Sequence, residues 1–286
     1  MKKIEDVKWI GVALRPKTPE LVETYKQLKV KAEELGIKVM LIRTEDVEYQ
    51  EERDFDEVCR LADVLISLGG DGTFLSLARK SIKFQKPLLG IHYGKLGFLA
   101  ETKAAETERT LIDLKDGNFG IKERLVIEAI VKTQEDRKLL AVNELVFKSI
   151  KTSGIASLKL FIKDKYINSY FGDGLIAATP TGSTAYNLSA GGPILYPFAQ
   201  NIILTPIASH SLSQRPLVLP IDCEKMEIKI EDGGAVIVAD GQEEIKLKKG
   251  TAVEIRKYEL PVKVAWKEDR DFFGVLREKL NWGDHR

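Results

Sequence analysis

Short hydrophobic runs alternate with longer segments of helical periodicity in the first 124 residues of the chain. Consecutive apolar residues predict strands, and apolar residues recurring about every three to four positions predict helices. We expect strands at 8–14, 37–42, 64–68 and 88–91, and helices at 18–35, 54–62 and 73–83. Strands alternating with helices are typical of a parallel sheet covered by helices. The pattern therefore predicts an N-terminal α/β domain of the Rossmann-like kind.

The pattern changes near Leu125, where β-rich runs broken by turns replace the helical segments. We expect strands at 125–131, 139–147, 158–162, 175–178, 226–230, 235–239 and 253–264, with one helix at 184–190. An amphipathic helix is expected at 271–280. We therefore predict an α/β domain at 1–124, an all-β domain at 125–266, and a C-terminal segment at 267–286 that returns to the first domain.

Composition narrows the classes of partner. Lys and Arg number 44 against 43 Asp and Glu, so no overall positive field favours nucleic acid. No stretch approaches the roughly 20 apolar residues of a membrane span, and the N-terminus lacks an export signal. Cys59 and Cys223 lack metal-ligand spacing and are expected to be free thiols. The sequence thus favours a cytoplasmic protein with small-molecule partners, and neither nucleic acid nor a membrane.

The segment Gly69-Gly70-Asp71-Gly72-Thr73 follows an apolar run and is the strongest candidate for chemistry. Its glycines can adopt backbone angles closed to other residues, and Thr73 is expected to open a helix, so the loop suits phosphate. Asp71 would repel phosphate unless it binds a metal or accepts a proton from an attacking hydroxyl. The alternative is a tight turn in which Asp71 caps the helix. The additional glycines favour a catalytic Asp71, and neither a Walker loop nor a dinucleotide fingerprint is present.

Three further segments carry polar groups suited to a nucleotide. The first, at 172–186, combines glycines and hydroxyl residues with Asp173 and Tyr186. The second, Asn143-Glu144, offers amide and carboxylate groups to a ribose diol, although a solvated strand face explains it equally well. The third, Asp240-Gly241-Gln242, is expected to be a hairpin turn.

The order and spacing of these motifs resemble the bacterial NAD kinase family over almost the whole chain. The resemblance is carried by 69–73, by Gly94-Lys95-Leu96-Gly97-Phe98-Leu99, by 143–144, by 172–174, by 179–193 and by 240–242. The first motif is shared with lipid kinases and phosphofructokinases, whereas the long segment 179–193 is much more specific to NAD kinases. The chain is therefore identified as a member of the NAD kinase family.

This resemblance implies transfer of the γ-phosphoryl group of ATP to the 2′-hydroxyl of the adenosine ribose of NAD, with a divalent metal, usually Mg²⁺. It implies an N-terminal α/β domain and a C-terminal β-sandwich, and a homodimer or homotetramer. By motif position Asp71 would be the general base, Gly69, Gly70 and Thr73 would belong to the phosphate loop, and no side chain is assigned as a metal ligand. The positions implied at NAD are Gly72, Asn143, Glu144, Asp173, Ser183, Thr184, Ala185, Tyr186, Asn187, Leu188, Ser189, Ala208 and Gln242, with Phe98 near the adenine.

Two positions depart from the family pattern. His92 stands where many members have asparagine, and Phe171 precedes Gly172 where a basic residue is frequent. A lipid kinase is the enzymatic rival, but its wide apolar acceptor channel does not agree with the hydroxyl-rich segment 179–189. A binding module without catalysis is the other rival, and the retained Asp71 argues against it. The sequence leaves open whether polyphosphate replaces ATP, whether NADH is accepted and whether NADPH inhibits.

Overall fold

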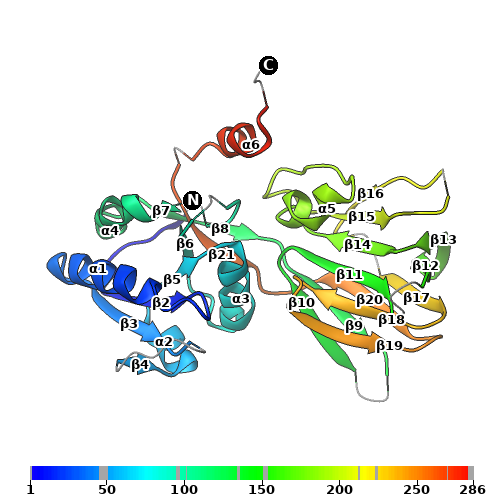
Figure 1. Ribbon diagram of the computed structural model, residues 1–286, viewed down its shortest axis with the longest axis horizontal. Coiled ribbons are helices and arrows are strands. Elements are labelled where there is room, and N and C mark those ends of the chain that lie inside the picture. The colour runs from blue at the N-terminus through cyan, green and yellow to red at the C-terminus, as the bar shows by residue number, and fades with distance from the viewer. Residues whose placement is uncertain are drawn as a thin grey trace. The chain divides into compact units, whose positions relative to one another are not determined.

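The computed structural model describes residues 2–44, 51–94, 97–100, 102–133, 136–150, 154–211, 213–222, 225–268 and 270–282. The chain forms two compact units (Figure 1). The first unit comprises residues 1–122 and 263–286, and the second comprises residues 123–262. The chain thus returns to the first unit at Lys263, four residues before the expected position. The reason is that strand β21 (Val262–Trp266) lies parallel to β6 (Leu88–His92).

A nine-stranded sheet, counted over the described residues, forms the centre of the first unit. Its order is β1 (Lys2–Lys3), β8 (Gly120–Arg124), β21, β6, β5 (Val64–Gly69), β2 (Trp9–Leu14), β3 (Lys38–Ile42) and β4 (Glu52–Arg53), with β7 (Thr102–Lys103) beside β6. The strands from β21 to β4 are parallel to their neighbours. Parallel strands bind ligands beyond their carboxyl ends, and here β5 ends at Gly69 and β6 at His92.

Helices cover both faces of this sheet, as predicted. Helices α1 (Leu21–Glu34) and α4 (Thr107–Lys115) pack their apolar side chains on the face that carries Ile10 and Val12. Helix α2 (Phe55–Leu61) lies on the opposite face, to which Gly11 points: a Cβ added at Gly11 would meet Val58 of this helix. The remaining helices are α3 (Asp71–Ser81), η1 (Ile82–Phe84), η2 (Ala104–Glu106) and α6 (Phe272–Leu280). The unit is a doubly wound α/β domain.

Helix α1 begins at Leu21, two residues after the start expected with Thr18 as the cap and Pro19 in the first turn. The hydroxyl of Thr18 donates to the carbonyl of Pro16 at 3.1 Å instead of capping a helix that starts there. The N–H of Leu21 donates to the carbonyl of Thr18, so residues 18–20 form a turn that leads into the helix. The prediction failed because the hydroxyl has a local backbone acceptor that competes with the capping role.

Two antiparallel six-stranded sheets, again counted over the described residues, form the second unit. One has the order β10 (Arg137–Ala141), β9 (Ile127–Val131), β20 (Ala252–Lys257), β17 (Met226–Asp232), β12 (Ala156–Ile162) and β13 (Lys165–Gly172). The other has the order β16 (Leu217–Pro220), β15 (Asn201–Ile207), β14 (Gly174–Ala178), β11 (Glu144–Ser149), β18 (Ala235–Ala239) and β19 (Glu243–Leu247). Apolar residues of both sheets form one core, so the predicted β-sandwich is confirmed.

The predicted strand 139–147 is wrong in one respect, because it is two strands in different sheets. Strand β10 ends at Ala141 and β11 begins at Glu144, which leaves Val142 and Asn143 outside both. The predicted run 253–264 likewise divides into β20 and β21. Residues 141–147 are all buried, so burial does not mark the first division, whereas residues 256–261 at the second division are exposed or half-buried.

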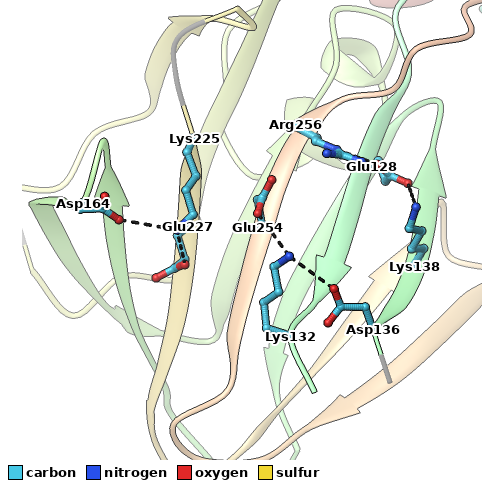
Figure 2. Close-up of polar contacts among 9 residues, drawn as sticks. All are labelled: Glu128, Lys132, Asp136, Lys138, Asp164, Lys225, Glu227, Glu254 and Arg256. Atoms are coloured by element: carbon cyan, nitrogen blue, oxygen red, sulfur yellow. Dashed lines mark hydrogen bonds and ion pairs between the residues drawn. The ribbon is translucent and has the colours of Figure 1, made fainter. Parts of the chain in front are cut away.

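Strands β13, β15 and β16 were not expected. Strand β13 is at the edge of its sheet, and most of its residues are exposed or half-buried, so it lacks the alternation that identifies a strand. Figure 2 shows why polar residues are common in this sheet: ion pairs such as Arg256–Glu128, at 2.7 Å, join neighbouring strands across one face. A sheet face that no apolar layer covers is stabilised when its charged side chains pair across neighbouring strands.

The thiol of Cys59 is buried and free, as predicted. Burial raises its pKa to about 12, with a smaller contribution from the negative charge of Asp56. A thiol that stays protonated is a weak nucleophile, so Cys59 is a packing residue. Cys223, the other cysteine, lies outside the described residues.

Candidate functional site

Asp71 lies in the first turn of α3, immediately beyond the carboxyl end of β5. Its carboxylate accepts three backbone hydrogen bonds, with Oδ2 accepting from Phe98 N–H at 2.8 Å. Oδ1 accepts from Leu99 N–H at 3.0 Å and from Ala100 N–H at 2.9 Å. The N-cap is Gly70, and no side-chain cap bond is present. The capping alternative is therefore wrong, and Asp71 instead fixes the loop 98–100.

Gly97 permits this arrangement. A Cβ at Gly97 would lie 1.9 Å from Asp71 Oδ1, which is a steric clash. Any side chain here would displace either the loop or the carboxylate. The motif 94–99 therefore serves Asp71, although Lys95 and Leu96 lie outside the described residues.

The phosphate-loop glycines do not adopt the backbone angles expected for them, since Gly69, Gly70 and Gly72 are absent from the residues of positive φ. Gly69 is needed for space, because a Cβ there would lie 2.4 Å from the hydroxyl oxygen of Thr73. Gly70 and Gly72 have no heavy atom within 4 Å of an added Cβ, so the space beside them is open. The helix also starts at Asp71 and not at Thr73. The loop therefore offers an open approach to the N-terminus of α3, where the partial positive charge favours anions.

Asp240 performs the same kind of bracing in the second unit. Its Oδ2 accepts from Val142 N–H at 3.0 Å, and its Oδ1 accepts from Asn143 N–H at 2.8 Å and Glu144 N–H at 3.1 Å. The predicted hairpin turn is confirmed, since Asp240 and Gly241 have φ of +48° and +67° and Gln242 N–H donates to Ala239 O. Sequence reasoning did not identify the bracing role of Asp240, because nothing in a hairpin signature names its distant partners.

Glu144 is a buried carboxyl group at the start of β11. Burial and, to a smaller extent, the negative charge of Asp240 together raise its pKa to about 7, while a hydrogen bond from Tyr186 N–H opposes both. Its Oε2 is buried without a hydrogen-bond partner among the described residues, as is Asn143 Oδ1. Burying unpaired polar atoms is costly unless a ligand or water satisfies them. These two side chains are therefore not a solvated strand face.

The turn 179–185 packs directly against this pair. Thr179 N–H donates to Asn143 O at 2.8 Å, and a Cβ at Gly182 would lie 2.2 Å from the same oxygen. The hydroxyl of Thr181 is a third buried polar group without a partner among the described residues. Thr181 was not among the predicted site positions, although the hydroxyl-rich turn pointed to it. Three unpartnered polar groups thus gather around one turn.

Several predicted residues in 183–189 have internal partners. The hydroxyl of Ser183 donates to Pro180 O at 2.7 Å and accepts from Leu195 N–H. The Asn187 amide is fully buried, donates to Ser183 O and Pro193 O, and accepts from the Thr205 hydroxyl. Both side chains shape the segment. The side chains of Tyr186 and Ser189 are exposed, whereas Thr184, Ala185 and Leu188 are half-buried.

Asp173 and Ala208 lie together but away from Glu144. They flank the strand pair β14–β15 at the end where Gly174 pairs with Ile207, whereas Glu144 pairs with Ala178 at the other end of β14. The structure thus divides the predicted positions in this unit into two groups. Gln242, exposed in its hairpin turn, belongs with the Glu144 group because Leu145 pairs with Ala239.

A resident metal site is not evident. Among the described residues, no group of three or more His, Cys, Asp and Glu side chains could hold a metal ion. The oxygens of Asp71 already accept the backbone hydrogen bonds given above. Over the described part of the chain, the helices include none with the length and hydropathy needed to cross a bilayer.

Comparison with known proteins gives consistent matches to both units. The family described as ATP-NAD kinase N-terminal domain matches residues 11–119, and the ATP-NAD kinase C-terminal domain family matches residues 142–265. An NAD kinase of Wolinella succinogenes is 42% identical over 286 residues, covering 99% of each chain. An NAD kinase of Sulfurimonas denitrificans is 39% identical over 280 residues, covering 97% of this chain and 98% of its own.

Solved structures agree with the sequence matches. An NAD kinase from Archaeoglobus fulgidus in complex with ATP has a TM-score of 0.79 at 27% identity, covering 96% of this chain and 98% of its own. Yeast NADH kinase complexed with NADH has a TM-score of 0.85 at 23% identity, covering 98% and 89%. The second comparison supports the fold alone, because the identity is low.

Proposed function

The chain belongs to the NAD kinase family, and from this we propose how its own residues carry out the reaction. The protein is a phosphotransferase that moves the γ-phosphoryl group of ATP to the 2′-hydroxyl of the adenosine ribose of NAD, giving NADP and ADP. The transition state of such a transfer carries spread negative charge, so catalysis depends on positioning and on electrostatic stabilisation.

Asp71 is the general base in this proposal. Its carboxylate takes the proton of the 2′-hydroxyl as that oxygen bonds to the γ-phosphorus, and the bond to ADP breaks. Three backbone N–H groups hold the carboxylate in place, and a carboxylate has about four acceptor positions, so Oδ2 retains one for the substrate hydroxyl. A fixed base avoids the reorientation that a free side chain would need.

The phosphate groups of ATP occupy the open side of the loop at 69–73 in this proposal. The support is the clear space at Gly70 and Gly72 and the helix N-terminus of α3. Mg²⁺ bound with ATP would neutralise charge on the phosphates at this loop, and no side chain is assigned as its ligand.

The observation that carries the NAD-binding assignment is the set of unpartnered buried atoms in the second unit. Asn143 Oδ1, Glu144 Oε2 and the Thr181 hydroxyl are polar groups that suit the base and hydroxyls of a nucleoside. An acyl chain would leave all of them unsatisfied, which argues against a lipid acceptor. The separate group at Asp173 and Ala208 suits a dinucleotide, which has a second nucleoside at a distance from the first.

The first experiment measures ATP- and Mg²⁺-dependent NADP formation by the wild type and Asp71→Asn. We expect turnover to fall by about 10²–10⁴-fold in Asp71→Asn while NAD binding persists, because a positioned base contributes that much. Since Asp71 also braces residues 98–100, Gly97→Ala is the matched variant: it disturbs the bracing and keeps the carboxylate. Hydrogen exchange at 98–100 reports the bracing in each variant. Near-normal turnover in Asp71→Asn would reject Asp71 as the base.

Assembly and location complete the proposal. We infer a homodimer or homotetramer located in the cytoplasm, on the family resemblance. The edge strand β13 exposes Tyr166, Ile167 and Phe171, and exposed apolar side chains on an open edge favour association with another chain. Light scattering of the purified protein tests the assembly, and a monomer at micromolar concentration would reject it.

A further inference from the structure

Strand β6 ends in a buried histidine whose side chain is not used by any part of the mechanism above. His92 is 7% exposed, and both of its ring nitrogens are buried without a hydrogen-bond partner among the described residues. An imidazole always has at least one N–H donor, so a donor is buried here for which no described residue is the acceptor. Leaving such groups unpaired is destabilising, which indicates that the position is retained for a bound group.

The sheet register places this ring on the side of the glycine loop. His92 pairs with Gly69, the last residue of β5, and Tyr93 N–H donates to Gly69 O at 2.9 Å. Paired residues of neighbouring strands point to the same face, and Leu68 and Ile91 point to the face covered by α1. His92 and Gly69 therefore point to the opposite face, where a Cβ at Gly69 would touch Thr73 in the first turn of α3.

Asp71 is not the missing partner of His92. Among the described residues both ring nitrogens lack a hydrogen bond, and the carboxylate oxygens of Asp71 accept from the loop 98–100 instead. The register thus places the ring on the face of the sheet where α3 begins and where the space at Gly70 and Gly72 is open. Among the residues that the structure describes, these features indicate a site that lacks a negatively charged hydrogen-bond acceptor.

We propose that His92 is an additional phosphate-binding residue, which donates an imidazole N–H to a non-bridging phosphate oxygen of the phosphoryl donor. This rests on the proposed function, in which the loop at 69–73 receives ATP. Phosphate oxygens are strong acceptors, and an N–H that donates to an anion forms a stronger hydrogen bond than one that donates to a neutral group. His92 then acts together with the dipole of α3 on the same phosphate group.

The kinetic test compares His92→Leu and His92→Asn with the wild type. His92→Leu removes both ring nitrogens at similar size, and we expect KM for ATP to rise about ten- to hundred-fold, the factor for a hydrogen bond to a charged group. KM for NAD should not change. The melting temperature of the ligand-free protein should stay level or rise in His92→Leu, because no satisfied hydrogen bond is lost. His92→Asn keeps an N–H donor and should recover part of the affinity for ATP.

A merely structural histidine would behave differently. In that case His92→Leu would lower the melting temperature and raise both KM values together, and this result would overturn the proposal. His210→Leu is the matched control, because His210 is an exposed histidine of the second unit. It should leave both KM values unchanged.

A spectroscopic test separates this proposal from the proposed function. The chain has 3 histidines, so ¹⁵N-histidine labelling gives few signals, and the signals that His92→Asn and His210→Leu each remove are thereby assigned. We expect inorganic tripolyphosphate alone to shift the ring nitrogens of His92. No shift with tripolyphosphate or ATP, or a shift with NAD alone, would reject the proposal. If the His92 signals shift in a protein that makes no NADP, phosphate binding by His92 is supported and only the kinase reaction is rejected.

Discussion

Replacing Asp240 by asparagine tests whether one carboxylate holds residues 142–144 in place. Asp240 accepts three backbone N–H groups, from Val142, Asn143 and Glu144, at 2.8–3.1 Å. An asparagine oxygen in the place of Oδ1 could keep the bonds to Asn143 and Glu144. The asparagine NH₂ group would then stand in the place of Oδ2, facing the N–H of Val142, so that two donors oppose each other.

The expected loss of stability follows from these three bonds. Leaving one buried N–H unpaired costs about 1–3 kcal/mol, and the two remaining bonds weaken because their acceptor is no longer charged. We therefore expect the free energy of unfolding to fall by about 3 kcal/mol at pH 5. At pH 8 the loss should be smaller, because Glu144 is then ionised and removal of the negative charge of Asp240 relieves a repulsion.

Urea unfolding of the full chain, followed by far-ultraviolet circular dichroism, measures this change at both pH values. Trp9, Trp266 and Trp282 all lie in the first unit, so tryptophan fluorescence reports that unit separately. Hydrogen exchange at 142–144 shows whether the loss occurs at the turn. Asp232→Asn is the matched control, since its carboxylate is 78% exposed and pairs across the surface with Lys249 at 3.3 Å. It should change stability by less than about 0.5 kcal/mol.

Two results would refute the reasoning. A loss below about 1 kcal/mol in Asp240→Asn, with unchanged exchange at 142–144, would mean that the three hydrogen bonds do not hold the turn. An equal loss at pH 5 and pH 8 would mean that the charge of Asp240 does not act on Glu144.

Three further changes test other parts of the structure. Folding raises the pKa of Glu144 from 4.5 to about 7, so between these pH values the folded protein binds a proton that the unfolded chain releases. The free energy of unfolding therefore falls by about 3 kcal/mol as pH rises through this range. Glu144→Gln should flatten this pH dependence in urea titrations between pH 4.5 and 8. Arg256→Met removes the 2.7 Å partner of Glu128 but leaves it the ion pair with Lys138 at 3.4 Å, and the Arg256 side chain is 50% exposed, so thermal unfolding should show a loss of about 1 kcal/mol; an unchanged stability would mean that the Arg256–Glu128 pair does not contribute. Gly182→Ala places a Cβ 2.2 Å from Asn143 O, and calorimetry should show weaker NAD binding together with a lower melting temperature. Unchanged NAD affinity would mean that the turn 179–185 is not part of the NAD site.

The glycine loop shows where sequence reasoning was right for a different physical reason. The pattern Gly69 to Thr73 predicted a loop open to phosphate, and the open space at Gly70 and Gly72 agrees with that. The expected cause, backbone angles closed to other residues, is not found there. Glycine is a signal for either unusual angles or close approach, and only coordinates distinguish the two.

The C-terminal part of the β-domain shows a limit of hydrophobic patterns. The run 253–264 was expected to be one strand, and it divides between two sheets in different units. Residues 256–261 at the division are exposed or half-buried, so the sequence contains a polar break there, but the break does not say which sheet each half joins. The hydrogen-bond partners of a strand depend on residues far away in the sequence.

The sequence by itself determined the two-domain order, the α/β and all-β classes, the loop at 69–73 and the hydroxyl-rich turn, because each depends on periodicity or on local residue types. The tertiary structure alone decided that Asp71 braces 98–100, that Asp240 braces 142–144 and that His92 is buried without a partner among the described residues. These contacts join residues up to 98 positions apart. A carboxylate or an imidazole looks the same in sequence whether it is satisfied or not, since its partners are set by the fold and not by its neighbours along the chain.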